Sequence, residues 1–381
     1  MIAVRAGRVC PVASEPVENG VVLIENGKIL AVGQSLPVPP DARVYSFPGC
    51  TVTPGLIDAH THLGQFGIQD LPEGNDMQSP VCPQMHVTDG VDPHARAFAR
   101  TRSAGFTSVC LLPGSANIIG GTGAVVKLKD AAELRDMVYG PAQIKMALGE
   151  NPRRSYGLDR GRAPMTRMGN AAILREAMRA AHEYDEAARR GAPLGYDARW
   201  EAMRPAFSGE ARIHVHCHRR DDILTAIRIL EPYGVRFSID HATEGHFVSD
   251  ILAEKQIPCI VGPISCGPQK NETWNCTPRC AAILERAGVQ PLALTIDGDL
   301  QVCYLPIDVG FCIANGLSER AAFRAVTSGA AQILGVGERT GALAPGMDAD
   351  LAVFSGYPFA CDTLCRGVFI DGEYYESTEV Y

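Results

Sequence analysis

Two histidines, His60 and His62, follow a short apolar run in the segment PGLIDAHTH (residues 54–62). Side chains at positions i and i+2 of a strand lie on the same face, so both imidazoles can reach one point. Imidazole nitrogens bind zinc and other divalent transition metals, and a strand end holds such ligands rigidly. A bare His-x-His pair is most often incidental, but this setting predicts one corner of a metal site.

Further histidines occur at the ends of other apolar runs. His214, His216 and His218 alternate, so all three could lie on one side of a strand. We assign His216 as the metal ligand, because His214 lies deeper in the strand and His218 lies beyond its end. His218 is assigned to the substrate or to the surroundings of the metal. His241 closes the next apolar run and is predicted to be another ligand.

The elements that must position these histidines are eight runs with strand character. They are separated by loops and helical segments, and a long amphipathic helix is predicted over residues 170–190. Alternating strands and helices predict a parallel sheet, and eight repeats fit a TIM-type barrel, whose strand ends carry function. The eight predicted strands are 56–60, 107–112, 124–128, 143–148, 212–217, 235–241, 257–261 and 291–296.

Both ends of the chain have β character. Asn26-Gly27 between two apolar runs is a hairpin signal, and a second hairpin is predicted at residues 369–373. We therefore predict an α/β protein with two domains. Residues 1–53 and 340–381 would form a small composite β-sandwich domain, and residues 54–339 would form a (β/α)8 barrel.

The segment PGLIDAHTH resembles the first-strand signature of the amidohydrolase superfamily, whose members are mostly metal-dependent hydrolases on a (β/α)8 barrel. The segments LPGSANIIGG (112–121), ALGENP (147–152) and DDILTA (221–226) are similar to the imidazolonepropionase-related branch. The resemblance covers nearly the whole chain. It implies a metal-activated water that hydrolyses a C–N bond of a cyclic or acyclic amide.

The resemblance also implies roles for residues on the fourth and eighth strands. Glu150 ends the fourth run and is our favoured ligand there, while Lys145 would match the carbamylated bridging lysine of binuclear members. Asp297, on the eighth run, is the predicted catalytic residue, which takes a proton from the activated water and passes it to the leaving group. The related branch more often has Asp-His-Pro here, so Asp299 is the alternative.

Several residues beside these strand ends could contact a substrate. Arg153, Arg154 and Tyr156 follow the fourth strand, and Arg219 follows His218. Arginine binds carboxylates through two parallel hydrogen bonds, so these residues are candidates for gripping a substrate carboxylate. The alternative is that the arginines are solvated or paired with acidic neighbours.

Composition and charge limit the classes of molecule that this protein is expected to bind. The net charge of −8 and the absence of a Lys/Arg-rich run exclude a nucleic-acid surface, and no apolar run reaches the ~18 residues that cross a bilayer. The thirteen cysteines include no Cys-x-x-Cys pair, and the N-terminus lacks a signal-peptide core. We expect a cytoplasmic protein with a small-molecule substrate and no membrane partner; a homo-oligomer is left open.

The expected cofactor is one or two Zn²⁺ ions, with Mn²⁺ or Fe²⁺ as alternatives. Two other functions compete with amide hydrolysis. One is a deaminase on the same scaffold, which would release ammonia. The other is a catalytically inactive metal-binding relative, since a shared fold does not fix function.

Overall fold

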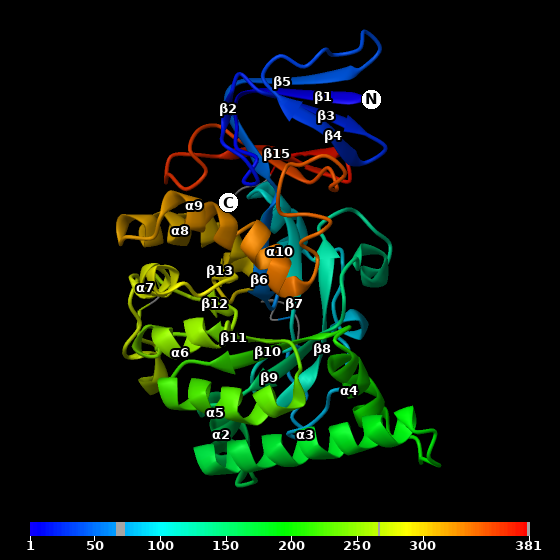
Figure 1. The fold of residues 1–381 in the computed structure, drawn as a ribbon, viewed down its shortest axis with the longest axis vertical. Coiled ribbons are helices and arrows are strands. Elements are labelled where there is room, and N and C mark those ends of the chain that lie inside the picture. Colours follow the sequence, from blue (N-terminus) through cyan, green and yellow to red (C-terminus); the bar gives the residue numbers. More distant parts are fainter. Residues whose placement is uncertain (66–72, 266, 379–381) are drawn as a thin grey trace.

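The computed structural model describes residues 1–65, 73–265 and 267–378. Eight strands follow one another in chain order in a single sheet (Figure 1). The ends of this sheet approach each other, because the backbone N–H of His62 donates to the carbonyl of Gly298 (3.1 Å) and the Thr295 hydroxyl donates to the carbonyl of His60 (2.7 Å). The sheet is therefore a nearly closed barrel of the TIM type, as predicted. Its strands are β6 (Leu56–Thr61), β7 (Phe106–Leu111), β8 (Ile119–Lys127), β9 (Gln143–Ala147), β10 (Arg212–Cys217), β11 (Phe237–His241), β12 (Cys259–Val261) and β13 (Leu292–Leu294).

The third strand, β8, departs from the predicted pattern. It pairs antiparallel with both β7 and β9, whereas the other neighbouring strands of the barrel pair in parallel. The segment 112–118 between β7 and β8 contains no helix. A short connection cannot carry the chain back along the barrel, so the next strand must run the opposite way. The prediction of an all-parallel sheet was wrong at this strand.

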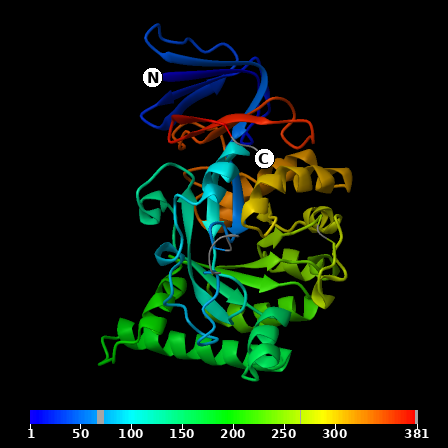
Figure 2. The same ribbon diagram turned by 180° about the vertical axis from the view of Figure 1, so that it is seen from behind.

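Helices pack outside the barrel on most of the other connections (Figures 1 and 2). The predicted long helix is confirmed as α3, which begins after Thr166, whose hydroxyl accepts the N–H of Gly169 (3.1 Å) and so caps the helix. Leu174, Met178 and Ala181 on one face of α3 are buried. The α-helices are α1 (Arg96–Ser103), α2 (Glu150–Arg153), α3 (Arg167–Arg189), α4 (Ala198–Ser208), α5 (Arg220–Leu230), α6 (Ser249–Glu254), α7 (Cys280–Ala287), α8 (Leu305–Ala314), α9 (Glu319–Ala325) and α10 (Ser328–Leu334).

The two ends of the chain share a second sheet, which lies at the opposite end of the molecule from α3 (Figure 1). Both predicted hairpins are present: β3 pairs with β4 across Asn26-Gly27, and β15 pairs with β16 across Asp371-Gly372. The N-terminal and C-terminal strands meet where β14 pairs antiparallel with β5. That this domain is a β-sandwich stays a prediction, as do the domain boundaries. Its strands are β1 (Ile2–Val9), β2 (Val17–Glu18), β3 (Val21–Glu25), β4 (Lys28–Gly33), β5 (Arg43–Pro54), β14 (Leu351–Phe354), β15 (Cys365–Ile370) and β16 (Glu373–Glu376).

A single glycine, Gly55, separates β5 of the terminal sheet from β6 of the barrel. A Cβ atom at this position would come within 2.1 Å of the Thr107 side chain on β7. The strand that carries His60 therefore enters the barrel in close contact with its neighbour, which only glycine permits. Among the described helices, none has the length and apolar character needed to cross a membrane.

Candidate metal centre

His60 and His62 lie at the C-terminal end of β6, and both face the barrel interior. The Nε2 atoms of His60 and His62 lie 3.4 and 3.3 Å from Oδ1 of Asp297. The Nδ1 atom of His62 lies 2.8 Å from the carbonyl oxygen of Leu112. A carbonyl can only accept a hydrogen bond, so Nδ1 of His62 carries the hydrogen and Nε2 keeps its lone pair for a metal.

His241 and Asp297 reach the same point from β11 and from the segment after β13. Both have left-handed backbones, with φ of 72° at His241 and 51° at Asp297. Such conformations are uncommon outside glycine and concentrate at functional sites. The Nδ1 atom of His241 lies 2.8 Å from the carbonyl of Gly262, which again leaves Nε2 for a metal.

The fifth strand, β10, contributes His216 and its neighbour His218. Their ring centroids are 4.6 Å apart, and they lie 4.3 and 4.7 Å from the ring of His241. His218 is nearly fully buried, and its Nδ1 lies 2.8 Å from the hydroxyl of Thr243. It is thus part of the histidine group and not a solvated loop residue.

The electrostatics favour the forms that bind metal. Burial lowers the pKa of the His60, His216 and His241 imidazoles below its usual value, so these rings are neutral at pH 7. Burial by itself raises the pKa of the Asp297 carboxyl, but His241 and His62 hold it well below its usual range. Neutral imidazoles and an ionised carboxylate are the forms that ligate divalent cations.

The donor set fits a metal. His241 belongs to two groups of potential ligands. One group also contains His60 and Asp297, and the other also contains His216 and His218. Within each group, the ligand atoms lie within 4.8 Å of one another. Nε2 of His241 and Oδ1 of Asp297 are buried atoms without a hydrogen-bond partner among the described residues. Buried polar atoms are rarely left unpaired, so these two point to an ion as the missing partner.

The fourth strand brings Lys145, and not Glu150, to this group. The Nζ atom of Lys145 is fully buried and lies 2.9 Å from Nε2 of His60. Gly149 has a φ of 89°, and α2 begins at Glu150, so the chain turns away from the barrel there. The Glu150 carboxylate instead accepts a hydrogen bond from Arg154 (2.8 Å). The preference for Glu150 as the strand-four ligand stays untested, but this turn and the Arg154 contact favour Lys145 instead.

The predicted substrate residues other than His218 lie outside the histidine group. Arg154 is paired with Glu150, and Arg219 forms two hydrogen bonds with the neighbouring carboxylate of Asp221 (2.9 and 2.8 Å). Arg153 donates to the carbonyl of Met165. Tyr156 is fully buried, and its hydroxyl donates to Asn117 (2.7 Å). Arg154 and Arg219 are thus paired with acidic neighbours, as the alternative interpretation has it, and substrate contact by these residues stays a prediction. Asp299, the alternative to Asp297, accepts the backbone N–H of Gly64 (2.8 Å).

The sequence interpretation missed polar residues that follow the seventh strand. The buried Oε1 of Glu272 lies 3.9 Å from Nε2 of both His216 and His218. Lys270 places its Nζ 2.8 Å from Glu272 and 2.8 Å from Oδ1 of Asn151. Barrel loops after strands carry function. The signal was therefore the position of the segment 270–272, in a loop that follows β12.

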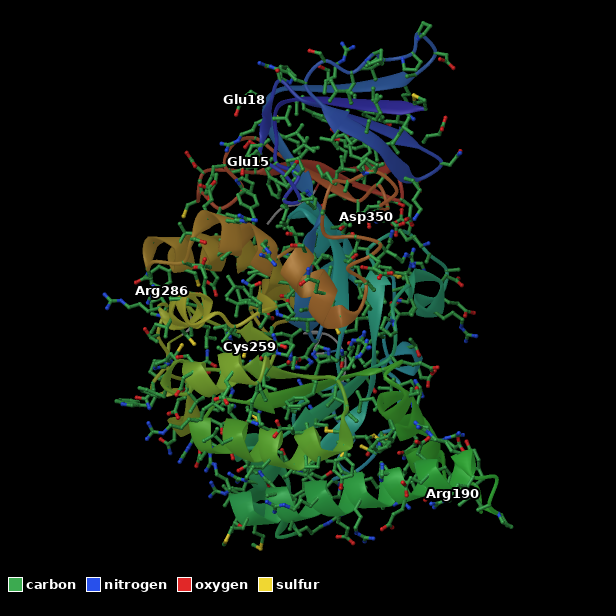
Figure 3. All side chains as sticks on the ribbon, viewed as in Figure 1. Glu15, Glu18, Arg190, Cys259, Arg286 and Asp350 are labelled. Carbon is green, nitrogen blue, oxygen red and sulfur yellow. The ribbon has the colours of Figure 1, made fainter. Side chains whose placement is uncertain are left out.

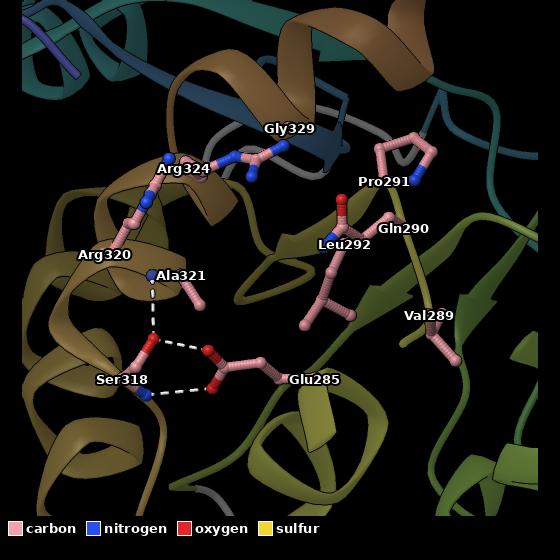
Figure 4. Close-up of a pocket in the computed structure, with 10 residues that line it drawn as sticks. All are labelled: Glu285, Val289, Gln290, Pro291, Leu292, Ser318, Arg320, Ala321, Arg324 and Gly329. Carbon is pink, nitrogen blue, oxygen red and sulfur yellow. Dashed lines mark hydrogen bonds between the residues drawn. The ribbon is translucent and has the colours of Figure 1, made fainter. Parts of the chain in front are cut away.

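A surface cavity of about 260 Å³ lies elsewhere, between the start of β13 and α9 (Figure 4). Ser318 lines it and forms hydrogen bonds with the Glu285 carboxylate through its backbone N–H (2.9 Å) and its hydroxyl. This cavity is at the N-terminal end of β13, whereas Asp297 follows its C-terminal end. It therefore has no part in the histidine group. Figure 3 labels Cys259, which lies on the barrel strand β12.

Comparisons with known proteins agree with this fold. The solved structure of an amidohydrolase from Thermotoga maritima is 34% identical, with a TM-score of 0.92, over 99% of this chain and 100% of that one. Amidohydrolase tasK of Hapsidospora irregularis is 28% identical over 93% of this chain, which spans 39% of that protein. The imidazolonepropionase of Streptococcus sanguinis is 46% identical over 15% of this chain and 14% of its own length.

A model described as the amidohydrolase family matches residues 310–374. This chain spans well under two thirds of the two curated relatives named above. The family is metal-dependent, in agreement with the two groups of ligand atoms that share His241. With the matching barrel and the full-length likeness to the Thermotoga maritima protein, these findings show that the chain belongs to the amidohydrolase superfamily.

Proposed function

We propose that this protein is a metal-dependent amidohydrolase that hydrolyses a C–N bond of a small cyclic or carboxylate-bearing amide. The observation that carries the proposal is the convergence of several histidines, most of them buried, on the Asp297 carboxylate. His60, His62, His241 and Asp297 would hold one ion, and His216 with His218 would hold or flank a second. Zn²⁺ suits this nitrogen and oxygen donor set best, and it would activate a water molecule for attack on the amide carbonyl.

Lys145 is our proposed strand-four residue, in place of Glu150. Its amine is buried beside His60, and burial lowers the pKa of the Lys145 amine. A neutral amine can add to CO₂ and lose a proton to form a carbamate, which would be an anionic ligand for the metal. Asp297 would take the proton from the water and pass it to the leaving nitrogen, because its carboxylate is held ionised and its side chain is 25% exposed.

The test is metal analysis of the purified protein, with a hydrolysis screen of cyclic amides, N-acyl amino acids and proline dipeptides. We expect at least one equivalent of metal per chain and release of a carboxylate product. His62→Ala should lower the metal content, whereas His94→Ala, at an exposed histidine, should not. Absence of metal, with no activity after zinc or manganese is added, would overturn the proposal. Ammonia release from purines or pterins alone would favour a deaminase.

Lys270 is the proposed contact for a substrate carboxylate. The Lys270 side chain is 24% exposed. It is hydrogen-bonded to Asn151, whose Nδ2 lies 3.4 Å from Nε2 of His216. Charged hydrogen bonds contribute about 1.5–3 kcal/mol, so Lys270→Met should raise KM for a carboxylate-bearing substrate roughly 10- to 100-fold.

The measurement compares each carboxylate substrate with its uncharged amide analogue, because the analogue reports any general damage to the site. Lys255→Met is the matched control, since Lys255 forms an exposed ion pair with Glu231 (2.6 Å). An equal loss for both substrates in Lys270→Met would show that Lys270 acts on the site as a whole and does not recognise the carboxylate.

A further inference from the structure

A buried carboxylate, Asp240, contacts the ring nitrogen of His60 that faces away from the proposed metal. Its Oδ2 is 2.6 Å from Nδ1 of His60 and 2.9 Å from Nδ1 of His214. Its Oδ1 accepts the hydroxyl of Ser238 (2.6 Å). All four side chains are buried in the barrel core, and Asp240 lies at Nδ1 of His60, whereas Asp297 lies at its Nε2. Asp240 therefore contacts a proposed ligand but does not belong to the group that faces the substrate.

The ring of His60 presents its two nitrogens to two different environments. Nδ1 faces Asp240, whereas Nε2 faces Lys145 at 2.9 Å and Asp297 at 3.4 Å. A carboxylate that accepts the Nδ1 hydrogen leaves the lone pair on Nε2 and fixes the angle of the ring. We infer that Asp240 is a positioning residue, which holds His60 in the tautomer and orientation that bind the metal.

His60 differs in this from the other two histidines of its group. His62 and His241 are held by the backbone carbonyls of Leu112 and Gly262. A carboxylate raises the basicity of the imidazole that it orients more than a neutral carbonyl does, because it is negatively charged. Asp240 thus strengthens His60 as a ligand as well as orienting it.

The backbone explains how Asp240 reaches this position. Neighbouring side chains of a regular strand point to opposite faces, yet Asp240 and His241 both contact residues of the barrel interior. The left-handed φ of 72° at His241 breaks the alternation and permits this. The ladder between β10 and β11 pairs His214 with Ser238, so these two of the three partners of Asp240 lie one level deeper in the barrel.

The rest of this chain of hydrogen bonds keeps Asp240 in place. Gln143 donates its amide hydrogens to the carbonyls of Pro141 (2.8 Å) and Leu334 (3.1 Å), so its Oε1 must face Nε2 of His214, which lies 2.8 Å away. Both nitrogens of His214 therefore face oxygen acceptors, and the His214 ring is fixed. A fixed His214 ring in turn limits the movement of the Asp240 carboxylate.

The trio of His60, His214 and Asp240 could itself be considered a metal site, since its ligand atoms lie close together. The distances oppose this. Two ligand atoms about 2.1 Å from a tetrahedral ion lie roughly 3.4 Å apart. The separations of 2.6 and 2.9 Å from Oδ2 of Asp240 are those of charge-assisted hydrogen bonds. The trio therefore orients His60 and does not itself hold a metal ion.

The inference rests on the proposed metal site, and its test is metal affinity. Asp240→Asn keeps the size of the side chain and removes its charge, and we expect the Kd for Zn²⁺, from competition with a chromogenic chelator, to rise about 10- to 100-fold. The visible absorption of the Co²⁺-substituted protein should also shift, because the angle of one ligand changes. Asp185→Asn is the matched control, since Asp185 is a buried carboxylate on α3 that pairs with Arg189 and Arg204.

Ser238→Ala provides a second variant if Asp240→Asn fails to fold. It removes the hydroxyl that holds Oδ1 of Asp240, and it should weaken Zn²⁺ binding more than Asp185→Asn does. Thermal unfolding of the metal-free variants separates damage to the fold from damage to the site. Wild-type affinity and an unchanged Co²⁺ spectrum in a folded Asp240→Asn protein would overturn this inference alone. A wild-type protein that binds no metal would overturn it together with the proposed function.

Discussion

Replacing Asp297 with asparagine is expected to lower kcat for amide hydrolysis about 10²- to 10⁴-fold, the range for loss of a general acid–base residue. The carboxylate lies within 3.3–3.4 Å of two histidines and is held ionised at pH 7, whereas an amide cannot accept the proton. Because Asp297 also lies in a ligand group with His60 and His241, the assay is run at saturating metal, and the bound metal is measured in the same sample.

Asp299→Asn is the control for this experiment. Its carboxylate accepts the backbone N–H of Gly64, and the oxygen of asparagine can accept the same hydrogen bond. We expect kcat to stay within a few-fold of the wild-type value. If Asp297→Asn retained full turnover with its metal in place, or if Asp299→Asn lost as much activity as Asp297→Asn, the assignment of the proton shuttle to Asp297 would be wrong.

The sequence alone placed the histidines of this site because their spacing matches the strand period. His60 and His62 share a face of β6, and His216 and His241 lie at or near the ends of adjacent strands, so a barrel brings them together. Lys145 was recognised as an alternative from the resemblance to binuclear members, and in the structure it lies beside His60.

Features that depend on local backbone turns were not predictable in this way. The turn at Gly149 starts a helix and directs Glu150 toward Arg154, although the apolar run before it reads as a strand that continues. The reversal at β8 follows from a connection without a helix, which hydrophobic periodicity does not reveal. Asp240 was missed because strict alternation would point it away from His241.

A second site of concentrated charge joins the barrel to the terminal sheet. Lys127, at the end of β8, is 1% exposed, and its Nζ lies 2.7 Å from Asp348 and 3.1 Å from Asp350 and is also paired with Asp371. Figure 3 labels Asp350 at this junction. Arg339 adds a further ion pair to Asp348 (3.0 Å). These contacts connect a barrel strand to residues of the C-terminal segment, so they matter for stability and not for chemistry.

Lys127→Met is therefore expected to destabilise the protein by about 3–5 kcal/mol, the usual effect of removing one partner from a buried ion pair. The carboxylate of Asp350 has no exposed surface and would be left without its cation. Urea denaturation measures the loss, and Lys129→Met, at a less buried lysine two residues along, is the control. The double variant Lys127→Met/Asp350→Asn should recover part of the stability, because the unpaired buried charge is removed. The single variant Asp350→Asn is measured as well. If the loss of unfolding free energy in the double variant equals the sum of the losses in the two single variants, the lysine stem, and not its charge, stabilises the junction.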